Sequence, residues 1–237
     1  MTDYKLGVIG GMGPLATSMF YQKLIDHTEA KQDQDHIDTI ILNHATLPDR
    51  TYAILNHEAD TFLQAVGNDF KLLEYAGVTH IAIPCNTSHY FYESMQSMTN
   101  IPIIHMVEKT AEAIHAAYGA HSKVGILATN GTINTGIYDQ ACQKYELEPF
   151  HPNEALQQKV MDTIYQIKAD PSFDANILTD IITELLEQEA CTCIILGCTE
   201  LSCVPLPDHI QKYCIDPMDV LVKESIRLAD KTYITRS

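Results

Sequence analysis

Residues 83–87 read Ile-Pro-Cys-Asn-Thr, and residues 196–200 read Leu-Gly-Cys-Thr-Glu. Two more pairs of segments recur with nearly the same shift along the chain: 6–9 with 124–127, and 104–108 with 215–219. A repeat of this kind indicates that one supersecondary unit has been used twice. The sequence therefore predicts two similar halves, each with a cysteine directly after an apolar run.

Short β-rich apolar runs alternate with longer segments of helical period in both halves. We predict strands at 5–9, 39–43, 80–84, 103–105, 123–128 and 193–196. We predict helices that open at Pro14, that carry Phe62, Leu63, Val66, Phe70 and Leu73 on one face, that begin at about Thr132, and that span 154–169 and 174–189. This alternation is typical of parallel strands joined by crossover helices. The predicted fold class is α/β.

Composition predicts a soluble cytoplasmic protein. The 237 residues are 46% hydrophobic and 19% charged, with no apolar run of the roughly 20 residues that a bilayer requires. The first residues lack the pattern of a signal peptide. Seven cysteines without disulfide spacing fit a reducing compartment. The net charge of −16 opposes nucleic-acid binding, so no nucleic-acid or membrane partner is expected.

Cys85 and Cys198 follow equivalent apolar runs, which places each at the carboxyl end of a strand, where open α/β sheets bind ligands. Two such thiols suit removal of a proton from a weakly acidic carbon and delivery of a proton to the opposite face. A thiol near pKa ~8.5 needs only modest lowering for this task. The other five cysteines are interpreted as buried core thiols: Cys142, Cys191, Cys193, Cys203 and Cys214.

Several polar residues near these cysteines are candidate substrate contacts. Asn86, Thr87, Ser88 and Thr199 offer backbone N–H groups and hydroxyls. Arg50 follows the second strand and can grip a carboxylate with two hydrogen bonds, or can pair with Asp49 as a surface cation. Lys168 can reach a ligand or simply meet its own helix dipole. Thr129, in a turn after a strand, is either a donor to substrate or an ordinary turn residue.

A glycine-rich turn and the histidines offer competing interpretations. Residues 11–16 (GMGPLA) fit a dinucleotide fingerprint, but the next strand ends Leu-Asn-His without the expected acidic residue. We expect the glycines to let backbone approach a small substrate, and a nucleotide- or carboxylate-binding module is the non-catalytic alternative. The eleven histidines show no ligand spacing, so no metal is predicted. His89 and His105 can each tune a thiol or serve as satisfied structural histidines.

Segments along nearly the whole chain resemble the aspartate racemase branch of the aspartate/glutamate racemase superfamily: 10–17 (GGMGPLAT), 48–51 (PDRT), 84–87 (PCNT) and 197–201 (GCTEL). The resemblance implies two pseudo-symmetric parallel-sheet α/β domains with the active site in the cleft between them. The C-terminal helix would return to the first domain, giving 1–105 plus 217–237 and 106–216. The reaction would use no pyridoxal phosphate, metal or other cofactor. We also expect a homodimer.

By the same resemblance, Cys85 and Cys198 are the acid/base pair. Asn86, Thr87, Ser88 and Thr199 would surround the backbone carboxylate, Arg50 and Lys168 would reach the side-chain carboxylate, and Met12 would line the pocket; Thr129 and Glu200 complete the predicted substrate-binding set. Glutamate racemases usually have histidine where this chain has Glu200, which favours aspartate as substrate. The predicted reaction is interconversion of L- and D-aspartate. The alternatives are a glutamate or broad-specificity racemase, and an enzyme resembling maleate isomerase or arylmalonate decarboxylase.

Overall fold

The apolar runs form two parallel sheets, one in each of two units, in the computed structural model that describes residues 4–170 and 176–235. Unit 1 runs to Met106 and resumes at Met218, and unit 2 is Val107–Pro217. Each boundary lies one residue later than the sequence predicts. Within the described residues, no helix combines the length and apolarity needed to cross a bilayer. The predicted α/β class with two parallel sheets is confirmed.

Unit 1 is built on the parallel strand order β2-β1-β3, with β1 at Leu6–Gly10, β2 at Thr39–Asn43 and β3 at His80–Ala82. β3 ends before the predicted Pro84, because proline has no N–H to donate to a neighbouring strand. The predicted strand 103–105 was wrong in extent. It is a single parallel bridge between Ile81 and Ile103, since the chain enters a helix at Met106.

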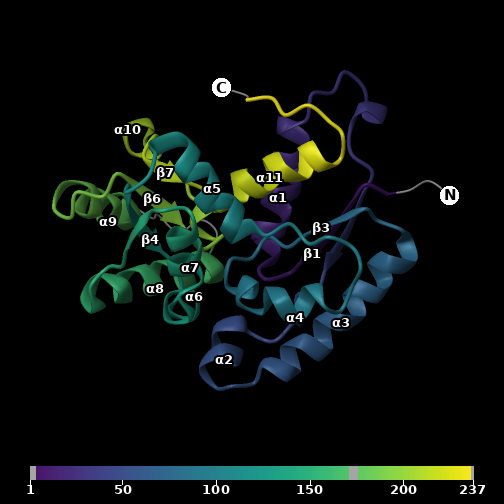
Figure 1. The fold of residues 1–237 in the computed structure, drawn as a ribbon, viewed down its shortest axis with the longest axis horizontal. Helices are drawn as coiled ribbons and strands as arrows, with labels where there is room; N and C mark the ends of the chain where they lie inside the picture. Colours follow the sequence, from purple (N-terminus) through teal and green to yellow (C-terminus); the bar gives the residue numbers. More distant parts are fainter. Residues whose placement is uncertain (1–3, 171–175, 236–237) are drawn as a thin grey trace. The chain divides into compact units, whose positions relative to one another are not determined.

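Alternating strand side chains bury two faces of this sheet. Leu6 and Val8 pack with α1 (Pro14–His27) and α11 (Pro217–Leu228), which lie side by side in Figure 1. Ile9 and Ile81 pack on the other face with α3 (Ala59–Ala76) and α4 (Tyr92–Gln96). Pro14 opens α1 as predicted, and the buried face of α3 carries four of its five predicted apolar residues, Leu63 being half-buried.

Unit 2 repeats the scheme with the parallel strand order β5-β4-β6-β7. The strands are β4 (Lys123–Leu127), β5 (Glu148–Phe150), β6 (Cys193–Leu196) and β7 (Cys214–Ile215). One face packs on α8 (Glu154–Ala169) and α9 (Asn176–Glu187), the other on α5 (Met106–Tyr118) and α7 (Ile137–Lys144). β4 and β6 therefore correspond to β1 and β3, as the repeat predicts.

The remaining elements are short, and most of them are not predicted from the sequence. They are η1 (Asp33–Asp35), α2 (Arg50–Leu55), η2 (Thr87–Phe91), α6 (Asn130–Thr135), η3 (Leu201–Cys203) and α10 (Asp208–Gln211). The helix predicted from Thr132 is two helices, because Gly136 adopts a left-handed conformation, with φ of 63°, between α6 and α7. Positions 174 and 175 of the predicted helix 174–189 lie outside the described residues.

The glycine-rich turn after β1 packs tightly against the chain itself. Gly11 has φ of +92°, and a Cβ there would lie 2.4 Å from the carbonyl carbon of His44. Its N–H donates to Oγ1 of Thr17 (2.8 Å), and the Thr17 hydroxyl donates to the Gly13 carbonyl (2.9 Å). Glycine is needed here for a backbone contact inside the fold, which is a reason that the sequence did not indicate.

Gly11→Ala should therefore cost far more stability than Gly77→Ala. Gly77 also has a positive φ, but a Cβ there meets nothing within 4 Å, so its replacement carries only the left-handed penalty of about 1 kcal/mol. The clash at Gly11 should raise the loss to about 3 kcal/mol or more. Urea unfolding measures both free energies, and equal losses would show that the contact with His44 is unimportant.

Candidate active site

The loop that carries Cys85 is fixed through its backbone at the end of β3. The Cys85 N–H donates to the Ile83 carbonyl (2.8 Å), and the Cys85 carbonyl accepts from the Ser88 hydroxyl (2.8 Å). The same carbonyl lies 2.9 Å from Nδ1 of His89. Cys85 is 5% exposed, and Asn86 and Thr87 beside it are buried as well. The Ser88 hydroxyl thus donates its proton to the Cys85 backbone, whereas the sequence predicts a contact of Ser88 with a substrate carboxylate.

His89 positions this loop as a neutral imidazole. Its Nε2 lies 3.2 Å from the Met106 nitrogen, whose N–H can only donate, and 3.4 Å from the Ile104 carbonyl, which can only accept. Nδ1 lies 2.9 Å from the Cys85 carbonyl, and the two shorter contacts are both satisfied when Nδ1 carries the ring proton and Nε2 accepts from Met106. Burial, reinforced by the neighbouring His105, lowers the pKa of His89 to about 4. His89 therefore contacts the backbone of Cys85 and not its thiol, which favours a structural role over a role in tuning the thiol.

Arg50 is a buried cation without an acidic partner among the described residues. Only 8% of it is exposed, and its guanidinium donates to the carbonyls of Pro48 (3.0 Å) and Met12 (3.3 Å). Asp49 caps α2 by accepting from the Tyr52 N–H (2.8 Å). The Nε of Arg50 is buried with no hydrogen-bond partner in the structure. Because a buried charge is costly unless it is compensated, this arrangement suits an anionic ligand.

The unit 1 candidates gather at the carboxyl ends of its strands. Met12 follows β1, Arg50 follows β2 and Cys85 follows β3. Met12 and Cys85 belong to one buried apolar cluster, and the helix of Arg50 contacts η2, which follows Cys85. Half of the predicted site thus assembles within unit 1.

Cys198 occupies the equivalent place after β6 in unit 2. The N–H of Gly197 donates to the Leu127 carbonyl at the end of β4 (2.7 Å), which fixes the chain just before the thiol. Cys198 is 6% exposed and Thr199 only 2%. The Cys198 Sγ lies 2.9 Å from Oε2 of Glu200, to which it donates a hydrogen bond.

The surroundings of Cys198 favour its protonated form. Burial raises the pKa of this thiol well above its usual range, and the negative charge of Glu200 raises it further. Lys168, whose Nζ lies 3.7 Å from Oε1 of Glu200, acts in the opposite direction. Glu200 itself is only 3% exposed, so its carboxylate is a buried charge held next to one cation.

Comparison with known proteins identifies the family of this chain. The family model described as Asp/Glu/Hydantoin racemase matches residues 9–225. The chain belongs to this family. The broad specificity amino-acid racemase RacX of Bacillus subtilis is 33% identical to this family member over 229 residues, which cover 93% of this chain and 96% of that one.

Solved racemase structures share the fold of this family member. An aspartate racemase from Picrophilus torridus superposes with a TM-score of 0.83 at 27% identity, covering 97% of this chain and 96% of that chain. A glutamate racemase from Francisella tularensis, solved with D-glutamate, gives 0.65 at 20% identity, with 96% and 81% covered. The second likeness shows the fold alone.

In this family member, Thr129 and Lys168 also have structural contacts. Thr129 caps α6 by accepting from the Thr132 N–H (3.3 Å), and Lys168 lies in the last turn of α8 and pairs with Glu200. The hydrogen bond between Cys198 and Glu200 is not among the contacts that the sequence predicts. The signal for it was present: an acidic residue two positions after the thiol in an otherwise apolar stretch.

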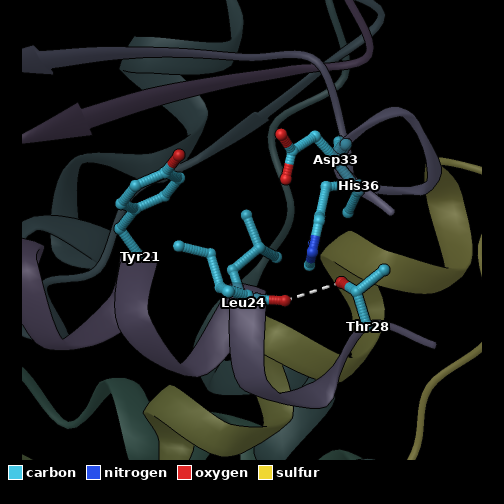
Figure 2. Close-up of a pocket in the computed structure, with 7 residues that line it drawn as sticks. Tyr21, Leu24, Thr28, Asp33 and His36 are labelled. Atoms are coloured by element: carbon cyan, nitrogen blue, oxygen red, sulfur yellow. Dashed lines mark hydrogen bonds between the residues drawn. The ribbon is translucent and has the colours of Figure 1, made fainter. Parts of the chain in front are cut away.

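A pocket of about 340 Å³ lies elsewhere in unit 1, and Figure 2 shows the side chains around it. It is lined by Tyr21, Leu24, Ile25, Thr28, Asp33, His36 and Ile37. The Thr28 hydroxyl, beside it, donates to the Leu24 carbonyl (2.6 Å). The pocket lies along the C-terminal half of α1, whereas the glycine-rich turn is at the other end of this helix. None of the predicted site residues lines the pocket. Within the described residues, no cluster of three potential metal ligands was found.

The low pKa of His89 should make folding stability depend on pH. Its pKa falls from 6.5 to about 4 on folding, so below pH 6.5 the unfolded chain takes up a proton that the folded chain does not. Stability is therefore lost as pH falls from 6.5 to about 4, by about 2 kcal/mol between pH 7 and pH 5. His89→Asn should remove that part of the pH dependence. Urea unfolding of both proteins at the two pH values, with exposed His57→Asn as control, measures it; an unchanged dependence would contradict the neutral assignment.

Proposed function

We propose that this protein interconverts L- and D-aspartate without a cofactor, with Cys85 and Cys198 exchanging protons with Cα from opposite faces. The observation that carries the proposal is the equivalent placement of two buried thiols, each in the loop that follows a corresponding strand of the repeated units. Family membership supports racemisation as the reaction class. The proposal includes a cytoplasmic homodimer that takes small amino acids and binds neither nucleic acid nor membrane.

The proton balance of the reaction assigns different starting forms to the two cysteines. A Cys85 thiolate would take the α-proton, leaving the electron pair on a planar carbanion-like Cα that is delocalised into the carboxylate. The Cys198 thiol would then give its proton to the other face. One turnover inverts Cα and exchanges the protonation states of the two sulfurs, so the resting forms return by proton exchange.

The charges of the described residues support a dicarboxylic substrate. Arg50 is buried, lacks an acidic partner and has an unsatisfied Nε, so a carboxylate would compensate it. In this proposal Asn86, Thr87 and Thr199 would offer donors to the other carboxylate. Lys168 is already paired with Glu200, which leaves Arg50 as the main proposed contact for the side chain of aspartate.

A broad-specificity racemase is the second candidate. It is favoured by the 33% identity to a relative of that description over almost the whole chain. A panel of L- and D-amino acids in D2O separates the two, because deuterium enters Cα only where a proton is exchanged. Exchange confined to aspartate supports the first candidate, and comparable exchange in neutral amino acids supports the second. Exchange in no amino acid would rule out both.

Replacing either proposed acid/base residue should stop racemisation. Cys85→Ser and Cys198→Ser keep the shape of the side chain but raise the pKa of the reacting group by several units, so we expect kcat to fall by about 10³-fold or more. Cys214→Ser makes the same change at a half-buried cysteine of unit 2 and should keep its activity. Polarimetry or chiral chromatography measures the rate, and full activity in either of the first two variants would sink the two-thiol mechanism.

Arg50→Ala should weaken binding of aspartate more than it slows the chemistry. Loss of a charge-assisted contact is expected to raise KM by about 10-fold to 100-fold. Arg50→Lys keeps the positive charge but lacks the planar guanidinium, so its KM should lie between those of the unmodified protein and Arg50→Ala. Steady-state kinetics with aspartate measures the effect, and an unchanged KM in Arg50→Ala would exclude this residue as the carboxylate contact.

A further inference from the structure

Cys198 is one member of a chain of three groups inside unit 2. Its Sγ lies 2.9 Å from one carboxylate oxygen of Glu200, and Nζ of Lys168 lies 3.7 Å from the other. Cys198 and Glu200 are almost fully buried, while Lys168 is 28% exposed at its side chain. A buried carboxylate normally needs compensation, and here a thiol proton and an ammonium ion supply it.

Glu200 cannot be explained as a simple partner of Lys168. An ion pair alone would leave both carboxylate oxygens free to face the ammonium, whereas here one oxygen is given to the thiol. The S–H group is the donor and the carboxylate oxygen the acceptor, so the proton of this pair lies on sulfur. The carboxylate carries the negative charge that pairs with the Lys168 ammonium.

We propose that Glu200, held by Lys168, is a positioning residue that keeps Cys198 protonated and aims its S–H group, so that Cys198 is the resting proton donor. This inference rests on the proposed function for its catalytic meaning. It assigns Glu200 a role through the thiol, in place of the direct contact with substrate that the sequence analysis gave it.

The charges around the thiol agree with this assignment. Among the described residues, the titratable or charged groups that face Cys198 are Glu200 in its own loop, Lys168 from α8 and Tyr138 from α7. Tyr138 is fully buried, and burial raises its pKa well above its usual range, so it adds no charge near neutral pH. The negative charge of Asp216 raises the pKa of Tyr138 further. Glu200 is therefore the negative charge that disfavours a Cys198 thiolate, and Lys168 is the positive charge that limits this effect.

The opposite signs of these two charges give a sharp test. Iodoacetamide reacts with the thiolate, so the rate of Cys198 alkylation follows its titration. Tandem mass spectrometry assigns the alkylation rate to Cys198, and the rate is measured as a function of pH. Each profile is divided by its own plateau at high pH, so that ionisation of the thiol is separated from its accessibility to the reagent. Glu200→Gln should move the midpoint to lower pH, with a rise of about tenfold in the scaled rate at pH 8 for each unit moved. Lys168→Met should move the midpoint to higher pH.

Two further variants serve as controls for charge and for folding. Glu187→Gln removes the same charge from an exposed position of α9 in the same unit and should leave the profile unchanged. Glu200→Asp keeps the charge and should stay close to the unmodified protein, and it preserves the test if Glu200→Gln does not fold. An unmoved midpoint in Glu200→Gln, or movement of Glu200→Gln and Lys168→Met in the same direction, would overturn the proposal, because loosening of the loop shifts both alike.

Kinetics distinguish positioning of the thiol from contact with substrate. Glu200→Gln should lower kcat for aspartate by about tenfold or more while KM changes little, since the proton donor is misplaced but the carboxylate contacts remain. A raised KM with kcat intact would overturn the assignment. If no amino acid is racemised, the proposed function fails, whereas the alkylation profiles still decide whether Glu200 holds the proton on Cys198.

Discussion

Parallel pairing of β3 with β1 and of β6 with β4 is the constraint on which each half of the proposed site depends. Parallel strands deliver their carboxyl ends to one edge of the sheet, so whatever follows each strand is brought together there. In unit 1 this edge collects Met12, Arg50 and Cys85, which are far apart in the sequence. The repeat places Cys198 at the matching edge of unit 2. Antiparallel pairing would have sent neighbouring loops to opposite ends.

Local periodicity explains which elements could be predicted from the sequence. The strand Thr39–Asn43, the strand Cys193–Leu196 and the helix Glu154–Ala169 have the bounds that were predicted, because their apolar patterns are strong. β5 has a proline and a glutamate within three residues, and only its pairing with β4 makes it a strand. The bridge at Ile103 likewise depends on a partner that local sequence does not contain.

The candidate site residues were recognisable by type, whereas the groups that they contact were not. The repeat singled out both cysteines, and their positions after strands followed from it. Asp49 caps α2, and Arg50 has no acidic partner among residues 4–170 and 176–235, an arrangement that depends on three-dimensional packing. The same holds for Glu200, whose chemistry is set by a thiol two residues away and by an ammonium group on another helix. Burial decides these roles, and single residues carry little information about burial.

The chain leaves unit 1 at Met106 and returns only at Met218, so unit 2 is one continuous segment and unit 1 is not. The core of unit 1 includes Phe20 and Leu24 of α1 together with Leu221 and Val222 of α11. During synthesis, α1 emerges from the ribosome long before α11 exists, and its apolar face must wait for nearly the whole chain. Unit 2 can be completed first, since domains generally fold as units once their residues are available. We therefore expect unit 2, in the middle of the sequence, to fold first. The core of unit 1 that surrounds the first strand is then completed only when α11 has been synthesised.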